Sequence, residues 1–174
     1  MAKIIVSESQ MRRLAEEIDK NDTIQKLIGA DSSSIDFEAE ETMAGISKRH
    51  HLYQIYPIVD GKRITTEYVS LLGEPINIDG EDWYQLHIRV NENIRRYGIA
   101  YKLYTAFIEQ GYPLCSLFSN RAGNFYKQQG TGQESDNAID NLWDKIKNTP
   151  GVKTDDIVRD GRVIGIKAYK SNKP

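Results

Sequence analysis

The chain has 174 residues, of which 39% are hydrophobic and 28% are charged. This length and composition are typical of one globular domain with a sizeable core, and they exclude a wholly disordered chain. The net charge of −2 argues against a protein that binds nucleic acid through contacts to its phosphates. One cysteine excludes an intrachain disulfide and a zinc site built from cysteines.

Hydropathy and charge indicate the compartment and the part of the chain that carries function. No apolar run approaches the roughly 20 residues of a membrane span, and Met1–Val6 is too short for a signal peptide and is expected to be a strand. We therefore expect no membrane segment and a reducing compartment, most simply the cytoplasm. Residues 1–44 carry 5 basic and 10 acidic residues, whereas residues 45–128 carry 10 and 8. The middle of the chain thus holds a modest positive field.

The segment after Met1–Val6 has the pattern of helices. Ser7 and Gln10 have capping-box spacing and open a predicted helix over 7–20. Its apolar residues recur at the helical period and are expected to pack on the core: Met11, Leu14, Ala15 and Ile18. Asp22 is suited to cap a second short helix that ends at Gly29.

From His51 onward the pattern is that of strands. Leu52–Val59 and Arg63–Leu72 predict two strands around an Asp60-Gly61 turn. Asp79-Gly80 predicts another turn before a strand over Trp83–Val90. Along that strand two sets of residues alternate between opposite faces: Tyr84, Leu86, Ile88 and Val90, and Trp83, Gln85, His87 and Arg89. The middle of the chain is therefore expected to be an antiparallel meander.

The last third is expected to alternate helices and strands. The predicted elements are a helix over Ile99–Gln110 ended by Gly111, a buried strand over Leu114–Phe118, helices over Ala122–Gln129 and Ser135–Lys147, and a closing hairpin of Asp156–Val158 and Val163–Tyr169 around Asp160-Gly161. The helix over Ser135–Lys147 has an apolar stripe of Ile139, Leu142, Trp143 and Ile146.

Together these elements predict one domain over 1–174 of the α/β (α+β) class. It divides into a strand and helices over 1–44, a meander with the chemical motifs over 45–130, and a helix with a closing hairpin over 131–174. We expect a mixed, mostly antiparallel sheet of about six or seven strands that is flanked by helices.

The most informative motif is Arg95-Arg96-Tyr97-Gly98-Ile99-Ala100, between a predicted strand and a predicted helix. A helix N-terminus presents unpaired backbone N–H groups and the positive end of the helix dipole, which together suit a phosphate. Gly98 permits a close backbone approach, and the two arginines add positive charge. Many strand–helix turns contain such residues and bind nothing, so a purely structural turn is an open alternative.

This motif resembles the acetyl-CoA pyrophosphate loop of the GNAT superfamily of N-acetyltransferases, which reads Gln/Arg-x-x-Gly-x-Gly/Ala. Arg95, Gly98 and Ala100 match its three defining positions. A second block of the family, Ala-x-x-Phe-Tyr-x-x-x-Gly, is matched by Ala122–Gly130. The resemblance is good over about residues 52–130 and architectural elsewhere. It implies a GNAT-like fold and transfer of an acetyl group from acetyl-CoA, as co-substrate, to a primary amine of a small molecule or a protein.

The resemblance also implies a set of cofactor-binding residues. In the family, the fourth and fifth strands splay apart, and the pantetheine arm pairs with the backbone of the fourth. The residues in the corresponding positions are Ile88, Arg89, Val90, Arg95, Arg96, Tyr97, Gly98, Ile99, Ala100, Ser119 and Asn120. Ser119 stands where the family often has an asparagine that contacts CoA, and Asn120 is one position late. The segment Thr131–Lys147 intervenes where the family usually continues directly into a strand.

Three residues are candidates for proton transfer. In the family, the tyrosine that Tyr126 matches often protonates the departing thiolate, although a helix tyrosine more simply packs its ring. His87 is a candidate base because imidazole titrates near neutral pH, and a polar residue on the second strand face is the favoured alternative. Glu67, expected on the preceding strand, is a candidate to activate an amine through water, and an isolated carboxylate is more often simply solvated.

Other noticeable residues have simpler interpretations. His50-His51 lacks a third nearby ligand, so no metal site is expected. Cys115 lies in an apolar run and is expected to be a buried small hydrophobe. Trp83 and Trp143 are expected to be packing anchors. The acidic stretch Asp36–Glu41 is expected to be solvated surface, with a charged flap for a cationic substrate as the alternative.

A second resemblance supports a different class of function. The opening Ile4–Leu14 is similar to openings common in phage-encoded proteins. It implies a catalytically inactive GNAT-fold accessory or virion protein, located in the host cytoplasm or the virion, with a homo-oligomer or virion proteins as partners. No membrane and no nucleic acid are expected as partners in either case.

Overall fold

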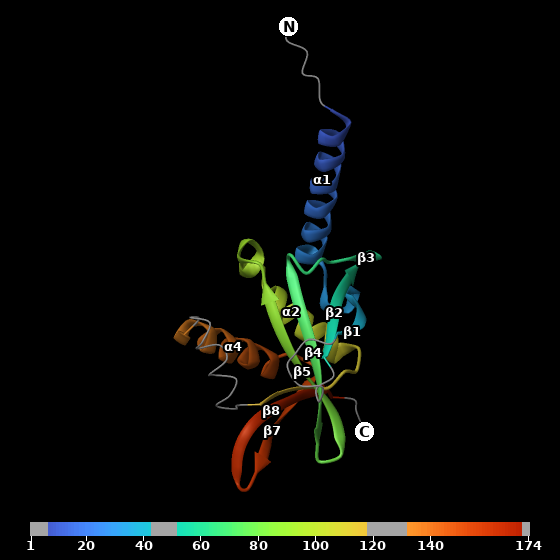
Figure 1. The fold of residues 1–174 in the computed structure, drawn as a ribbon. Helices are drawn as coiled ribbons and strands as arrows, with labels where there is room; N and C mark the ends of the chain where they lie inside the picture. Colours follow the sequence, from blue (N-terminus) through green and yellow to red (C-terminus); the bar gives the residue numbers. More distant parts are fainter. Residues whose placement is uncertain (1–6, 43–51, 118–131, 172–174) are drawn as a thin grey trace.

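The structure is a computed structural model of the chain, and it describes residues 7–42, 52–117 and 132–171. Within these residues an open, mostly antiparallel sheet of eight strands is flanked by helices (Figure 1). This arrangement confirms the expected α/β (α+β) class. The predicted strand Met1–Val6 and the predicted helix Ala122–Gln129 lie outside the described residues.

The sheet follows one path of seven strands with a short eighth strand beside it. In spatial order the path is β1 (Asp36–Thr42), β2 (Leu52–Val59), β4 (Val69–Ile78), β5 (Glu81–Val90), β6 (Leu114–Leu117), β8 (Arg162–Lys170) and β7 (Val152–Arg159). The short strand β3 (Lys62–Arg63) pairs with β2. Neighbouring strands are antiparallel except β5 and β6, which are parallel.

The three predicted Asp-Gly turns are present. Asp60, Asp79 and Asp160 have φ values of 50°, 54° and 52°, and the glycine after each also has a positive φ. Two consecutive residues with positive φ make the type I′ turn that matches the twist of a tight hairpin. These turns connect β2 to β3, β4 to β5, and β7 to β8.

One strand prediction is corrected. The predicted strand Arg63–Leu72 is interrupted, because the N–H groups of Tyr68 and Val69 both donate to the carbonyl of Thr65 and close a turn. Glu67 therefore lies in this turn and not on a strand. The side chains of the acidic stretch Asp36–Glu41 are mostly exposed, as expected of solvated surface, and the stretch forms the edge strand β1, which was not predicted.

The helices are α1 (Glu8–Gly29), α2 (Ile99–Glu109) and α4 (Gly132–Lys147), with short 3₁₀ segments η1 (Ser32–Ser34) and η2 (Glu92–Tyr97). The predicted break in the first helix is wrong, because α1 is continuous. Asp22 pairs with Lys26 at 3.3 Å, and the Thr23 hydroxyl donates to the carbonyl of Asp19 at 2.8 Å. These bonds satisfy both polar side chains within the helix, so Asp22 does not need to act as a cap.

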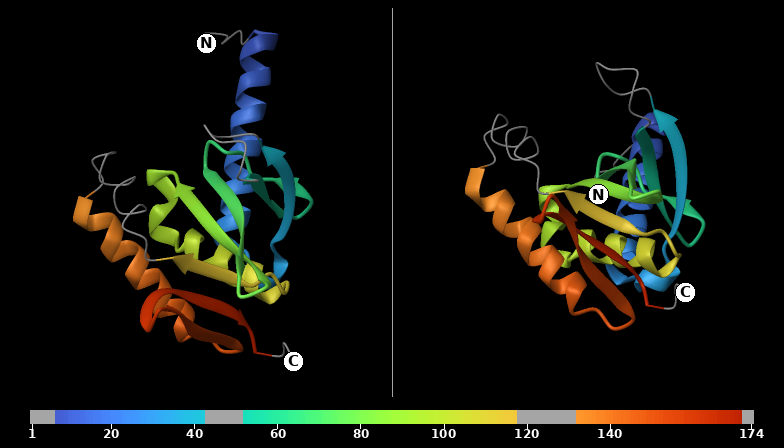
Figure 2. Two further views of the ribbon diagram at one scale, coloured as in Figure 1. Left: turned by 60° about the horizontal axis from the view of Figure 1, so that its bottom comes forward. Right: turned by 90° about the horizontal axis from the view of Figure 1, so that it is seen from below.

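The predicted core face of α1 is also corrected. The capping box of Ser7 and Gln10 is present, but Met11 and Ile18 are 62% and 68% exposed. Only the second half of the helix reaches the body of the protein, where Ile24 and Leu27 are buried. Figures 1 and 2 show the first half extending away from the sheet. Ile139, predicted on the buried stripe of α4, is likewise exposed, whereas Trp143 and Ile146 are buried.

The main core lies between the helices and one face of the sheet. Every residue of α2 from Leu103 to Ile108 is buried, because this helix is covered by the sheet on one side and by its neighbours on the other. Leu86 and Val90 of β5 pack into this core, as the alternation predicts. On the opposite face a smaller cluster of strand residues contains Trp83 and Cys115. The burial of both tryptophans and of Cys115 confirms their predicted packing roles.

Candidate functional site

Strands β5 and β6 separate along part of their length. Their parallel ladder pairs Tyr84 with Leu114 and Gln85 with Cys115, and it ends there. Ser116 and Leu117 of β6 continue their pairing with β8, while β5 continues beside β4 as far as Val90. In the described part of the chain, no strand covers this edge of β5 beyond Gln85. Among the described residues the β5–β6 ladder therefore ends early, which agrees with the separation that the resemblance implies.

The backbone groups on the open edge belong to alternate residues of β5. The N–H of Tyr84 donates to the carbonyl of Pro113 on the β6 side, whereas the N–H of Asn91 donates to Tyr68 on the β4 side. Even-numbered residues therefore direct their N–H and C=O groups toward the open edge. Ile88 lies at the middle of this edge, with its side chain packed against the core.

Two side chains occupy the neighbouring carbonyls of the edge. The Tyr104 hydroxyl of α2 donates to the carbonyl of Leu86 at 2.9 Å, in a buried position. The Arg95 Nε donates to the carbonyl of Val90 at 3.0 Å. These bonds satisfy the carbonyls on either side of Ile88. The Ile88 carbonyl and the N–H groups of Ile88 and Val90 therefore face the open edge and can pair with an extended ligand.

The open edge leads directly into the predicted phosphate loop. After Val90 the chain forms η2 and reaches Gly98, which has a φ of 67° and precedes the first residue of α2. No side chain of the described residues caps this helix, so the N–H groups of its first turn are available to an anion. A Cβ placed at Gly98 would meet no atom within 4 Å, and Tyr97 beside it is 53% exposed. The loop is therefore open to a ligand.

Residues of the loop divide into those that fix it and those that are exposed. Ile94 and Ile99 are buried and anchor its two ends in the core, so Ile99 can offer a ligand only its backbone N–H. The Asn91 side chain accepts from the N–H of Asn93 and shapes the start of η2. The side chains of Arg95 and Arg96 are exposed and bring positive charge to the helix N-terminus.

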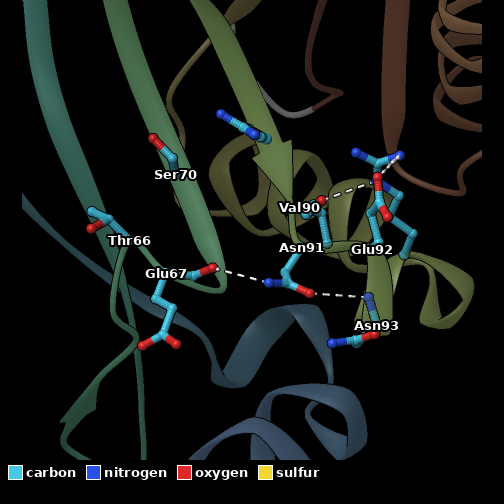
Figure 3. Close-up of a pocket in the computed structure, with 9 residues that line it drawn as sticks. Thr66, Glu67, Ser70, Val90, Asn91, Glu92 and Asn93 are labelled. Carbon is cyan, nitrogen blue, oxygen red and sulfur yellow. Dashed lines mark hydrogen bonds and ion pairs between the residues drawn. The ribbon is translucent and has the colours of Figure 1, made fainter.

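A cleft of about 710 Å³ lies at the end of β5 (Figure 3). Its lining includes Ser70 and Arg89, which face each other across β4 and β5 on the face opposite α2, and Arg95 from the loop. The Asn91 side chain lines the cleft, and its Nδ2 donates to the carbonyl of Glu67. The cleft therefore lies beside the end of β5 on the β4 side; Arg89, Val90 and Arg95 belong to its lining, whereas Ile88 and Gly98 do not.

Glu67 lines this cleft, but its carboxylate is directed away from the end of β5 (Figure 3). It forms an exposed ion pair with Lys20 of α1, at 3.5 Å. A carboxylate in this position contributes to the surface charge of the cleft mouth.

His87 lies on the polar face of the sheet, one residue before Ile88. Its Nε2 is 3.6 Å from the Oε2 of Glu74 on β4, and both side chains are partly buried. Sequence reasoning identified His87 but missed Glu74. The signal that was available is the antiparallel register of β4 and β5, which places Glu74 opposite Gln85 and diagonal to His87.

The structure thus brings nine of the predicted cofactor residues, 88–90 and 95–100, into one continuous strand–loop–helix unit. Tyr126, Ser119, Asn120 and His50-His51 lie outside the described residues. Residues that sequence reasoning missed include Ser70, Asn91 and Tyr104, whose roles depend on contacts between distant elements. In the described ranges, no group of three or more His, Cys, Asp or Glu side chains is arranged to hold a metal ion.

Comparisons of the chain with protein-family models, with curated proteins and with solved structures found no match. The described helices include none that is long and apolar enough to cross a membrane. A function is therefore inferred from the site itself.

Proposed function

We propose that the protein is an acetyl-CoA-dependent N-acetyltransferase that acts on a primary amine. The observation that carries this proposal is the junction of two features at the end of β5. One is the uncovered backbone edge at Ile88, and the other is the uncapped helix N-terminus behind Gly98. An extended arm that ends in a pyrophosphate would use both features at once.

The backbone supports binding of the extended arm. A pantetheine arm contains amide groups, and the Ile88 N–H and C=O are oriented to pair with them as a neighbouring strand would. In the GNAT superfamily, which the loop resembles, the arm lies at this position. The Leu86 carbonyl is already bonded to Tyr104 and the Val90 carbonyl to Arg95, which restricts the register in which an arm can pair.

The loop supports binding of the pyrophosphate. The N–H groups of the first turn of α2 and the dipole of that helix favour a negative group. Arg95 and Arg96 add charge from exposed positions. The left-handed conformation of Gly98 brings the backbone to the surface without a side chain in the way.

The chain's residues also offer a route for protons. Acetyl-CoA would supply a thioester whose acetyl group is transferred to the amine nitrogen as the carbon–sulfur bond breaks. An amine with a free pKa of about 10 must lose a proton before it can attack. His87, held by Glu74 on the polar face beside Ile88, is the candidate acceptor of that proton. Tyr126 is the candidate donor to the departing thiolate, by its match to the family motif.

Calorimetry with acetyl-CoA tests this proposal, and Gly98→Asp provides the decisive variant. The new carboxylate would accept hydrogen bonds from the N–H groups at the start of α2 and repel a pyrophosphate, so binding should weaken about tenfold or more. Gly111→Asp is the matched control, because Gly111 also has a positive φ and open space around it but lies at the other end of α2. This control should bind like the unchanged protein.

Absence of acetyl-CoA binding at millimolar concentration in a folded protein would contradict the proposal. Equal binding by the two glycine variants would remove the loop as the site of the pyrophosphate.

A second candidate is a catalytically inactive protein of the same fold that acts as an accessory or virion component. The exposed apolar residues Met11 and Ile18 on α1 favour this function, because such residues mark contact surfaces. Acetyl-CoA binding without transfer to any amine would support it over the enzyme.

A further inference from the structure

The first half of α1 has the features of a contact surface. Every side chain that the structure describes between Ser7 and Asp22 is exposed. The helix is held at its other end, where Thr23, Ile24 and Leu27 are buried against the body. Figure 1 shows the exposed turns of α1 extending beyond the sheet. Among the described side chains, this part of the helix therefore makes no contact with the core.

Ion pairs fix the direction of the exposed turns. Lys20 pairs with Glu67 at 3.5 Å, and Lys26 pairs with Asp60 at 3.6 Å. Asp19 pairs with Lys62 beside the turn that follows β2. At the N-terminal end of α1, the capping box of Ser7 and Gln10 satisfies the first N–H groups. The ion pairs thus orient α1 relative to the body, and the capping box stabilises its N-terminal end.

An exposed helix of this length needs a partner for its apolar side. Isolated helices of about 15 residues are marginally stable in water, and most helices gain their stability from packing of one face. Met11, Ala15 and Ile18 follow one another at the i, i+4, i+7 spacing of a single face, and all three are exposed. This apolar stripe is therefore the candidate contact face of α1.

The charges beside the stripe identify the partner. Residues 8–13 carry two arginines and one glutamate, whereas residues 16–22 carry four acidic residues and one lysine. Within the described part of the chain, Arg12, Arg13, Glu16 and Glu17 form no ion pair. The segment thus has a positive first part and a negative second part, which complement each other only when two copies run in opposite directions.

We propose that the protein forms a dimer in which the exposed halves of two α1 helices pair in an antiparallel arrangement. A two-fold axis between positions 14 and 15 places position 11 opposite 18, position 12 opposite 17, and position 13 opposite 16. Met11 of one copy then meets Ile18 of the other, and the arginines at 12 and 13 lie near the glutamates of the partner copy. A parallel pair would instead align like charges. The contact is isologous, so it closes at two copies.

Sedimentation analysis of the full chain tests this dimer over roughly a hundredfold range of concentration, because association follows mass action. The unchanged protein should shift from monomer to dimer as its concentration rises. Arg12→Glu with Arg13→Glu should abolish the shift, and Glu16→Arg with Glu17→Arg should do the same, since each variant opposes like charges in an antiparallel pair. An equimolar mixture of the two variants should dimerise again.

Two control variants separate the contact from general effects of charge and hydropathy. Arg159→Glu with Arg162→Glu makes the same change of charge at the exposed tip of the β7–β8 hairpin and should leave the dimer intact. Ile18→Asp should abolish the dimer, whereas Val158→Asp, at an apolar residue of similar exposure on β7, should not.

Three results would overturn the dimer. One is a protein of unchanged sequence that stays monomeric at every concentration. This result would overturn the dimer even if α1 then bound vesicles or another protein. The second is association that survives both charge-reversal variants. The third is failure of the mixture to associate while far-ultraviolet circular dichroism shows both variants folded. None of these readouts depends on acetyl-CoA, so the dimer and the proposed activity are tested separately.

Discussion

Single hydrogen bonds keep the edge of β5 in a form that a ligand could use. The Tyr104 hydroxyl donates to the Leu86 carbonyl, and the Arg95 guanidinium donates to the Val90 carbonyl, at positions where a neighbouring strand would otherwise pair. Exposed strand edges tend to pair with other chains unless they are shortened or covered. Here two side chains occupy the carbonyls of Leu86 and Val90, which leaves the Ile88 carbonyl and the N–H groups of Ile88 and Val90 on the open edge. The site is therefore defined at the scale of individual donors and acceptors.

His87 should act on the chemical step and contribute little to cofactor binding. Its ring lies on the face of β5 opposite the core and contacts Glu74, not the loop that carries the arginines. His87→Gln should lower turnover on the order of 10²-fold, the low end for general acid–base catalysis, with nearly unchanged acetyl-CoA affinity. Steady-state kinetics and calorimetry on the same preparation measure the two effects. Glu74→Gln should lower turnover less, and unchanged turnover in His87→Gln would remove it as the base.

Cys115 should be chemically inert in the folded protein. Burial raises the pKa of its thiol from the ordinary value of 9.0 to about 12, and the negative charge of Glu74 adds to this effect. Because the folded state favours the neutral thiol, this group stabilises the fold fully below pH 9, and the stabilisation is lost as the pH rises toward 12. At pH 8, alkylation should be roughly 10³-fold slower in the native than in the unfolded protein. Similar rates in both states would contradict this burial.

At the scale of elements, β6 and β8 should depend on a glycine at their contact. A Cβ at Gly165 would lie 2.5 Å from the carbonyl oxygen of Ser116 and 3.1 Å from the Cα of Leu117, which are backbone atoms that cannot turn aside. Gly165→Ala should therefore lower the free energy of unfolding by about 1–3 kcal/mol. Gly73→Ala is the matched control on β4, where the close atom is the flexible Cδ1 of Ile55. Denaturant titration should find the larger loss at Gly165, and equal losses would argue against this contact.

The elements differ in how well local sequence predicts them. The Asp-Gly turns and the alternation in Trp83–Val90 are local signals, and both are present in the structure. β1 was not predicted, because its acidic residues lack the apolar alternation that is typical of a strand. It nevertheless pairs with β2 over its whole length. The exposure of Met11 and Ile18 was not predictable either, because an apolar stripe has the same spacing whether it faces the core or a partner.

At the scale of the whole molecule, the parts of the candidate site were predictable separately, but their connection was not. The loop motif identified positions 95–100, and the alternation identified the backbone of β5. The end of the β5–β6 ladder at Gln85, the bond from Tyr104, and the pairing of His87 with Glu74 all depend on contacts between elements distant in the sequence. These contacts arise from the register of the sheet, which a single sequence specifies only weakly.

The fold keeps the proposed acetyl-CoA site apart from the proposed dimer contact. The cleft and the open edge lie at the end of β5, whereas the exposed Met11 and Ile18 lie on the projecting half of α1. Loss of the α1 contact by charge reversal should therefore leave acetyl-CoA affinity unchanged. A coupled loss of both would show that the dimer contributes to the site.

Amide hydrogen exchange of individual residues, followed by NMR with and without saturating acetyl-CoA, tests the proposed site most directly. The ligand should slow exchange at Ile88, whose N–H faces the open edge, and at the first turn of α2 after Gly98. His87 is the internal control, because its N–H faces β4 and should change little. Unchanged exchange at both Ile88 and the first turn of α2, in a protein saturated with acetyl-CoA, would contradict the site.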